Sequence, residues 1–214
     1  MSQNESLGRT VRDAASWDER YRTKREVSHR EPNQFLAGQI EGLMPGRALD
    51  LACGEGRNAV WLATRGWNVT GVDFSTIGLE GAKNLAASSG VTVQWACADV
   101  TRWHSDTTFD LVLVAYLHLP EVERRMAFVN AARSVAPGGT LLIVGHDLDN
   151  LTNGVGGPRS PLVLYTADTV RTDLESADVP NLTVDAAERV ERPVETDART
   201  VNAVDCLVRA HRQR

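Results

Sequence analysis

Residues 47–58 read RALDLACGEGRN, and residues 72–75 read VDFS. The first stretch begins with a short apolar run, continues through Gly54 and Gly56, and leads into apolar residues spaced as on one face of a helix. The run predicts a buried strand, and the glycines predict a tight loop that can adopt positive φ. A strand, a glycine-rich loop and a helix in this order indicate a βα unit of a parallel sheet.

The same alternation continues on both sides of this unit. The expected strands are residues 48–52, 68–73, 91–99, 109–117, 140–145, 182–190 and 201–210. The expected helices are residues 13–23, 32–43, one ending at Gly66, 75–89 with Ser75 as its N-cap, one ending at 137–139, and 166–177. This order predicts a doubly wound α/β fold with a mostly parallel seven-stranded sheet, closed at one edge by a C-terminal antiparallel hairpin.

Two segments stand outside the regular alternation. Residues 1–44 are expected to form an N-terminal helical lid segment on a compact domain of residues 45–214. Residues 147–161 form a loop rich in glycine and proline, and long loops of this kind in compact domains are usually functional or disordered.

Composition excludes several classes of protein. The 214 residues include 23 Lys and Arg against 28 Asp and Glu, a formal net charge of −5 without basic runs, which disfavours a nucleic-acid partner. No stretch approaches the roughly 20 apolar residues that span a bilayer, so no membrane partner is expected. The odd number and wide spacing of Cys53, Cys97 and Cys206 argue against a disulfide framework or a metal site and favour a cytoplasmic location.

Three acidic residues stand at the ends of neighbouring expected strands. Asp50 lies in the first, Asp73 ends the second and Asp99 follows the third. Ligands of open α/β sheets bind beyond the carboxyl ends of the strands, so these side chains are expected to converge on one crevice. A carboxylate at Asp50 would repel a pyrophosphate and attract a cation, whereas Asp73 suits a ribose diol. The ligand implied is a ribonucleoside with a positively charged tail.

These residues resemble a known family. Residues 48–58 with 72–75 resemble the first two motifs of class I S-adenosylmethionine-dependent methyltransferases, and residues 98–100 and 135–140 look like its later motifs. The motif CGEGRN and the upstream segment 17–21, WDERY, look most like the tellurite-resistance and thiopurine methyltransferase branch. The chain departs from the family at Ala52, where many members have glycine. The resemblance implies the Rossmann-like methyltransferase fold, with S-adenosyl-L-methionine as cofactor and S-adenosyl-L-homocysteine as product.

The resemblance also implies roles for single residues. Asp50 and the loop backbone would hold the methionine portion, Asp73 the ribose, and Asp99 the adenine amino group. Cys53 also reads as a small buried residue, and Arg57 and Asn58 read equally well as surface residues of a first helical turn. The cofactor-binding residues expected in full are Asp50, Cys53, Gly54, Glu55, Gly56, Arg57, Asn58, Asp73, Phe74, Ser75, Asp99, Val100, Ala115 and Leu117.

Histidines and aromatic residues near the strand ends are candidates for catalysis and for the acceptor pocket. His118 and His146 follow the fourth and fifth strands and are candidate general bases, although each also reads as a hydrogen-bonded structural histidine. Trp17 and Tyr21 share a helix face and are candidates to cover the cofactor, or simply to pack on the domain. Tyr165 is a candidate to line the acceptor pocket or to anchor the preceding loop.

The expected function is in-line methyl transfer to a small-molecule acceptor. A thiol, a chalcogen oxyanion or a phenol-like group would each suit, and the last would benefit from a base. Residues 115–118, AYLH, lack the Asn/Asp-Pro-Pro-aromatic run of enzymes that methylate DNA bases or protein glutamine. An NAD-dependent oxidoreductase and a non-catalytic nucleoside-binding module remain as alternatives.

Overall fold

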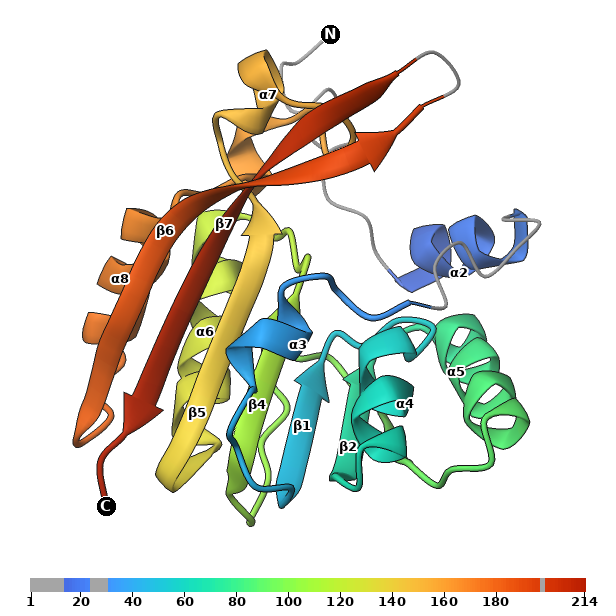
Figure 1. Cartoon of the computed structure of the whole chain (residues 1–214), viewed down its shortest axis with the longest axis vertical. Helices are drawn as coiled ribbons and strands as arrows, with labels where there is room; N and C mark the ends of the chain where they lie inside the picture. Colours follow the sequence, from blue (N-terminus) through green and yellow to red (C-terminus); the bar gives the residue numbers. More distant parts are fainter. Residues whose placement is uncertain (1–13, 24–30, 197–198) are drawn as a thin grey trace, which may run out of the picture.

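A single mixed sheet forms the centre of the computed structural model, which describes residues 14–23, 31–196 and 199–214 (Figure 1). Its strands are β1 (Arg47–Leu51), β2 (Asn68–Asp73), β3 (Gln94–Cys97), β4 (Phe109–Ala115), β5 (Val135–His146), β6 (Leu182–Glu195) and β7 (Thr200–Arg212). They lie in the order β3-β2-β1-β4-β5-β7-β6. β7 pairs antiparallel with β5 and β6, whereas the other neighbouring strands are parallel. The expected doubly wound α/β fold with a C-terminal antiparallel hairpin is confirmed.

The strand order reverses next to β1, which lies between β2 and β4. At such a point the connections from adjacent strands leave in opposite directions, and a crevice opens beyond their carboxyl ends. The loop after β1 and the segment after β4 therefore border one crevice. Gly54, Gly56 and the residues that follow β4, beginning with Tyr116, lie at the border of this crevice.

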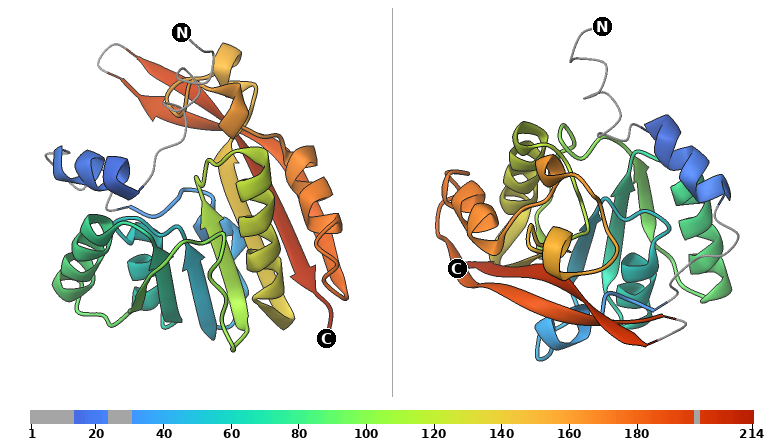
Figure 2. Two further views of the ribbon diagram at one scale, coloured as in Figure 1. Left: turned by 180° about the vertical axis from the view of Figure 1, so that it is seen from behind. Right: turned by 90° about the horizontal axis from the view of Figure 1, so that it is seen from above.

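Helices cover both faces of the sheet (Figure 2). They are α2 (Ala14–Thr23), α3 (Leu36–Gln39), α4 (Arg57–Thr64), α5 (Thr76–Ser88), α6 (Glu121–Arg133), α7 (Asn150–Asn153), the 3₁₀ helix η1 (Pro161–Val163) and α8 (Ala167–Glu175). Alternating residues of β4 divide the core: Leu111 and Leu113 pack with α3 and α4, whereas Val112 and Val114 pack with α6 and α8. This alternation buries β4 on both faces, as its near-continuous apolar sequence predicts.

Several expected boundaries differ from the structure. The helix expected at 32–43 is only α3, because Asn33 forms a turn with its side chain accepting from Phe35 N and because Gly38 and Gly42 disfavour a longer helix. The helix expected to end at 137–139 ends at Arg133. Phe109 pairs with Val135 and Leu111 with Thr140, so residues 136–139 bulge out within β5.

Other expectations hold, with corrections in detail. Ser75 caps α5 by accepting from Gly78 N, as predicted. β6 extends to Glu195, so residues 191–195, which were expected to lie between the last two strands, belong to it. The N-terminal segment 1–44 falls partly outside the described residues, and its described helix α2 packs against α5. Within the described ranges, no helix is long and apolar enough to cross a membrane.

Candidate functional site

Asp50 is a buried carboxylate without a hydrogen-bond partner. Its side chain lies in β1, is 1% exposed, and has neither oxygen bonded to a donor in the part of the chain that the structure describes. Burial, together with nearby Asp73, raises the pKa of this carboxyl to about 7, although the Ala59 backbone and the Arg57 guanidinium oppose the rise. A buried polar group of this kind calls for a partner, which makes Asp50 a candidate to bind a cationic or hydrogen-bond-donating ligand.

The loop after β1 is shaped for close approach to its backbone. Ala52, Gly54 and Gly56 have φ values of 60°, 53° and 77°, so the chain turns through left-handed conformations three times within five residues. Ala52 stands where the family resemblance expects glycine, and a non-glycine residue in this region carries strain of about 1 kcal/mol. A methyl group added at Gly54 would lie 2.7 Å from the Tyr21 hydroxyl oxygen.

Asp73 organises this loop. Its Oδ2 accepts a hydrogen bond from Gly54 N at 2.8 Å, and its Oδ1 accepts one from Ser75 N at 2.9 Å. Burial raises the pKa of Asp73, although the two backbone hydrogen bonds oppose the rise. The carboxylate thus fixes the loop, a task that the sequence interpretation did not assign to it. Each oxygen keeps a further lone pair for a hydroxyl group.

The expected convergence of three acids holds for two of them. Asp50 and Asp73 lie close enough to affect each other's charge, whereas Asp99 is exposed, and its Oδ1 accepts from both the backbone and the hydroxyl of Thr101. Val100, expected beside the adenine, is 2% exposed and packs in the core instead. Leu117, expected to line the sulfonium, also packs in the core, whereas Ala115 is half-buried.

The remaining cofactor candidates lie around the loop. Cys53 is buried, and burial raises the pKa of its thiol well above the usual value, which agrees with a small buried residue. Asn58 is 4% exposed and its Oδ1 accepts from Asn33 N, so the surface interpretation of Asn58 is wrong. Glu55 and Phe74 are half-buried.

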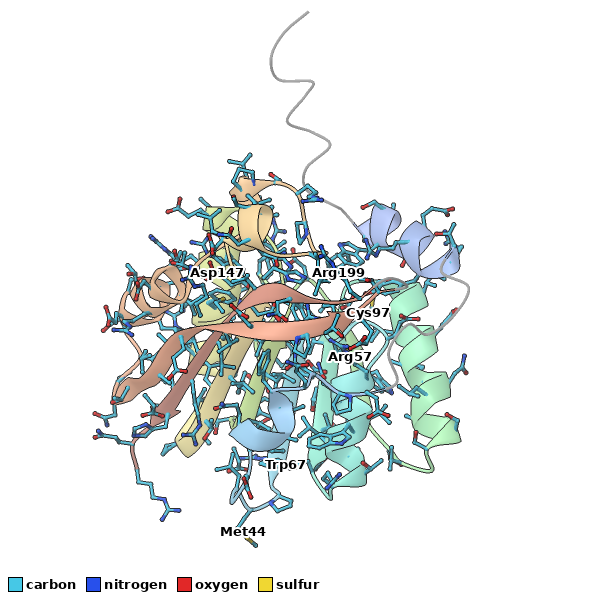
Figure 3. All side chains as sticks on the ribbon, turned by 45° about the horizontal axis from the view of Figure 1, so that its top comes forward. Met44, Arg57, Trp67, Cys97, Asp147 and Arg199 are labelled. Atoms are coloured by element: carbon cyan, nitrogen blue, oxygen red, sulfur yellow. The ribbon has the colours of Figure 1, made fainter. Side chains whose placement is uncertain are left out.

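Arg57 is half-buried where α4 begins, next to the β6–β7 hairpin (Figure 3). Its guanidinium lies 5.9 Å from the centroid of the Tyr116 ring. Burial lowers its pKa, although nearby Tyr116 and Asp50 oppose the change. Arg57 thus lies in the first turn of α4, as both interpretations of it expected, and its side chain is partly covered.

Helix α2 covers the loop from above. Asp18 Oδ1 accepts from Ser75 Oγ at 2.5 Å and from Ile77 N at 3.3 Å, which attaches α2 to the first turn of α5. Tyr21 packs over Gly54 and Gly78, and burial raises the pKa of its hydroxyl. Trp17 stacks beside Tyr21 with ring centroids 5.6 Å apart. The docking residue Asp18 was missed as a functional residue, although it lies within the WDERY segment.

A second cluster stands beyond the ends of β4 and β5. His146 Nδ1 lies 2.9 Å from Oδ1 of Asp205, the residue opposite it on β7, and Asp205 is 0% exposed. Tyr116 Oη and Arg192 Nε each donate to Asp205 Oδ2 at 2.7 Å. Burial alone would raise the pKa of Asp205, but these three neighbours outweigh it and lower the pKa. Asp205 therefore stays ionised, with its Oδ1 beside one ring nitrogen of His146.

The two histidines differ in their capacity to act as bases. The backbone N–H of His146 donates to His118 Nε2 at 3.0 Å, and burial with nearby His146 lowers the pKa of His118 to about 3. His118 is thus a neutral structural histidine, and its assignment as a candidate base is wrong for this arrangement. His146 Nε2 has no hydrogen-bond partner among the described residues, so it is the nitrogen left for a ligand.

Tyr165 anchors the loop that precedes it. The side chain is 2% exposed and its hydroxyl donates to Leu117 O at 2.9 Å. Its ring stacks on His118 with centroids 5.7 Å apart. The interpretation of Tyr165 as an anchor of the loop is therefore correct, and its hydroxyl is not directed at a methyl-acceptor molecule.

Besides Asp18, sequence reasoning missed three residues of the second cluster: Tyr116, Arg192 and Asp205. Asp205 carried a signal, since it is a lone carboxylate inside the apolar run 203–208. A charge within a buried strand is usually paired. Tyr116 has a φ of 59°, which no sequence pattern announced.

Comparisons with known proteins agree with this geometry. Residues 48–139 match the family model described as a methyltransferase domain. A curated relative, 2-heptyl-1-hydroxyquinolin-4(1H)-one methyltransferase of Mycobacteroides abscessus, is 30% identical over 133 residues, which are 60% of this chain and 59% of the relative. The chain thus spans about three fifths of the length of that relative.

Solved structures share the fold over nearly the whole chain. A protein studied for the conversion of a disulfide bond into a thioacetal group during echinomycin biosynthesis has a TM-score of 0.72 at 22% identity, covering 94% of this chain and 91% of that one. TehB from Haemophilus influenzae has a TM-score of 0.69 at 14% identity, covering 94% and 67%. Together the comparisons show that residues 48–139 are similar to methyltransferase domains and that the fold of the chain is shared with these solved structures.

Proposed function

We propose that this chain methylates a hydroxyl group of a small, phenol-like molecule, with S-adenosyl-L-methionine as methyl donor and His146 as general base. The observation that carries this proposal is the pairing of His146 Nδ1 with buried Asp205 while His146 Nε2 keeps no partner among the described residues. A histidine whose one nitrogen is held by a carboxylate has its other nitrogen ready to accept a proton.

The residues around the β1 loop fit the cofactor. The buried carboxylate of Asp50, which has no hydrogen-bond partner among the described residues, suits a positively charged ligand, and the absence of a side chain at Gly54 lets the Tyr21 hydroxyl approach the loop backbone closely. When bound, S-adenosyl-L-methionine supplies a methyl group activated by a positively charged sulfur. Asp50 would hold the charged methionine portion, Asp73 would accept from the ribose hydroxyls, and Tyr21 would exclude water from the loop.

The acceptor class follows from what the His146–Asp205 pair can do. A thiolate or a chalcogen oxyanion is already a nucleophile and would not need the His146–Asp205 pair to remove a proton. A phenol or an N-hydroxyl group must lose a proton as it attacks, and a positioned base accelerates such a step about 10²–10⁴-fold. The relative from Mycobacteroides abscessus is named for a hydroxyquinolone substrate, which supports an acidic hydroxyl as acceptor.

The finer assignments stay within this proposal. The motif CGEGRN and segment 17–21 support membership of the tellurite-resistance and thiopurine methyltransferase branch. The similarity to TehB, which is a similarity of fold alone, is consistent with this branch. α2 and the 147–165 loop would form the walls of the acceptor pocket. The three cysteines are free, which supports a cytoplasmic location, and we expect neither a nucleic-acid nor a membrane partner.

Two experiments test the proposal in order. Calorimetric titration with S-adenosyl-L-methionine, S-adenosyl-L-homocysteine and NAD should show binding of the first two only, and binding of NAD alone would end the methyltransferase assignment. A screen of 1-hydroxyquinolin-4-one, catechol, thiophenol and selenite then measures S-adenosyl-L-homocysteine formation. Turnover with a hydroxyl acceptor that falls in both His146→Ala and Asp205→Asn supports the base. Unchanged turnover in both variants, or turnover with thiophenol or selenite alone, contradicts it.

A further inference from the structure

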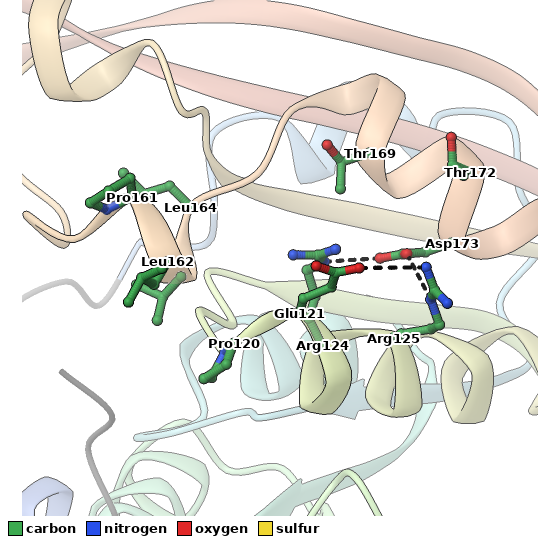
Figure 4. A pocket seen from close by; sticks show the side chains of 11 residues that line it. Pro120, Glu121, Arg124, Arg125, Pro161, Leu162, Leu164, Thr169, Thr172 and Asp173 are labelled. Carbon is green, nitrogen blue, oxygen red and sulfur yellow. Dashed lines mark hydrogen bonds and ion pairs between the residues drawn. The ribbon is translucent and has the colours of Figure 1, made fainter. Parts of the chain in front are cut away.

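A cleft of about 730 Å³ opens on the face of the sheet covered by α6 and α8 (Figure 4). It is lined by the start of α6, by η1 and by α8. Its volume lies within the range of about 300–1,000 Å³ that is usual for small-molecule sites. The ring of Tyr165 stands between this cleft and the histidines, since it lies 5.7 Å from the Arg124 guanidinium on one side and 5.7 Å from the His118 ring on the other. The cleft is therefore separate from the methyl-transfer site proposed above.

Arg124 lines the cleft with donors left over. Its side chain is 6% exposed, and only its Nε is bonded, to Asp173 Oδ2 at 2.9 Å. The other oxygen of Asp173 is taken by Arg125 Nε at 3.2 Å. A guanidinium carries five N–H donors, so the two terminal amino groups of Arg124 remain without a protein acceptor in the described part of the chain. This end-on pair of amino groups matches the two oxygens of a carboxylate.

An apolar surface lies beside this donor pair. Pro120, Pro161, Leu162 and Leu164 line the cleft, and Leu162 is 55% exposed. Figure 4 shows Pro161, Leu162 and Leu164 on one side of the cleft, with Arg124 beside Asp173 on the other. A ligand that fills the cleft thus needs an anionic end and an apolar body.

We infer that this cleft binds a small monocarboxylate with an apolar tail, its carboxylate on the terminal amino groups of Arg124 and its tail along Pro161 and Leu162. Charge agrees with this assignment. Arg124 and Arg125 share the single carboxylate of Asp173, and the only other acid in the lining, Glu121, is 72% exposed and 3.7 Å from Arg125. The Glu121–Arg125 pair is exposed, so water screens it and it contributes little. A ligand carboxylate would therefore serve as the second anion for Arg124 and Arg125 beside Asp173. The inference does not depend on the proposed methyl transfer.

Octanoate is a suitable probe, with octan-1-ol and octylamine as analogues that keep the tail and change the head. Binding is measured by titration calorimetry and by the backbone amide shifts of residues 121–125 and 162–164 in the full-length protein. We expect saturable binding of octanoate at those amides, and binding of both analogues at least about tenfold weaker, because only a carboxylate pairs with the guanidinium.

Two variants and one matched control locate the site. Leu162→Asp places a negative charge on the exposed wall without touching the core, and it should weaken octanoate binding at least about tenfold. Arg124→Lys keeps the charge beside Asp173 but lacks the paired amino groups, and it should weaken binding similarly. Val122→Asp makes the same change on an α6 residue that is 69% exposed and does not line the cleft, and it should bind octanoate as the parent does.

Three outcomes would overturn the inference. One is octanoate that shows no saturable binding, and another is octan-1-ol that binds as tightly as octanoate. The third is octanoate that binds Leu162→Asp as tightly as the parent, which would mean that it occupies another part of the protein. None of these outcomes bears on cofactor binding, which the titration with S-adenosyl-L-methionine measures by itself.

Discussion

Replacing Asp50 by asparagine is expected to stabilise the ligand-free protein at neutral and alkaline pH while it weakens cofactor binding. The carboxylate is buried in β1 with no hydrogen-bond partner among the described residues, and burial raises its pKa from 3.8 to about 7. Since one pH unit corresponds to about 1.36 kcal/mol, the interval between these values corresponds to about 4 kcal/mol. That is the order of the cost of keeping the ionised carboxylate in the folded chain.

The sign of the pH dependence follows from the same two values. Between them the folded chain keeps a proton that the unfolded chain has lost, so the stability of the parent falls as the pH rises from about 4 to about 7 and is then level. Asparagine is neutral throughout and escapes this loss. The difference in unfolding free energy between Asp50→Asn and the parent should therefore grow over this pH range, by up to about 4 kcal/mol.

Urea unfolding at pH 5 and pH 8, with the ligand absent, measures this difference. Asp106→Asn is the matched control, because Asp106 is exposed and the same substitution there should change stability equally at both pH values. Calorimetry on the same samples should show binding of S-adenosyl-L-methionine to the parent that strengthens with pH up to about 7, as Asp50 ionises. Asp50→Asn should bind at least about tenfold more weakly and without this dependence. A stability difference that is the same at pH 5 and pH 8 would refute the reasoning.

Three further substitutions test other parts of the site. His146→Gln should lower turnover of a phenolic acceptor about 10²–10⁴-fold and leave calorimetric cofactor affinity unchanged, and a parallel loss of affinity would contradict its role as base. Asp18→Ala should release α2 from α5 and lower the affinity for the cofactor. Faster amide exchange in residues 14–23 would report this release, whereas unchanged slow exchange would show that Asp18 does not hold the helix. Gly56→Ala should destabilise the fold by about 1–3 kcal/mol in urea unfolding, because φ is 77° and the added methyl would lie 2.7 Å from Ala82 Cβ; a neutral effect would mean that the loop relaxes.

The fold was predictable because its signals are local. The strand, loop and helix at 47–64 and the Ser75 cap depend on residues within a few positions of one another, so spacing alone reveals them. Errors arose where distant pairing overrode the local pattern. Residues 136–139 read as the stop of a helix, yet they form a bulge because Val135 pairs with Phe109 in β4.

The candidate site was predictable only in its cofactor half. Asp50 in β1 and the glycines of the loop that follows are close in sequence, which made them recognisable. The proposed base pair was not, because Asp205 and His146 are 59 positions apart and meet only through the antiparallel register of β5 and β7. In sequence His118 and His146 look alike, because each follows an apolar strand. The register of β5 and β7 distinguishes them, since it places His146 opposite Asp205.

By itself the sequence determined an α/β chain with a glycine-rich loop and an acidic residue in the strand before it. Apolar periodicity and glycine placement act over a single turn or strand, where the chain has few alternatives. Only the tertiary structure decided which acids lie together, which histidine is free to take a proton and which arginine keeps unused donors. Those properties depend on burial and on partners brought together from distant strands, and both exist only once the sheet has formed.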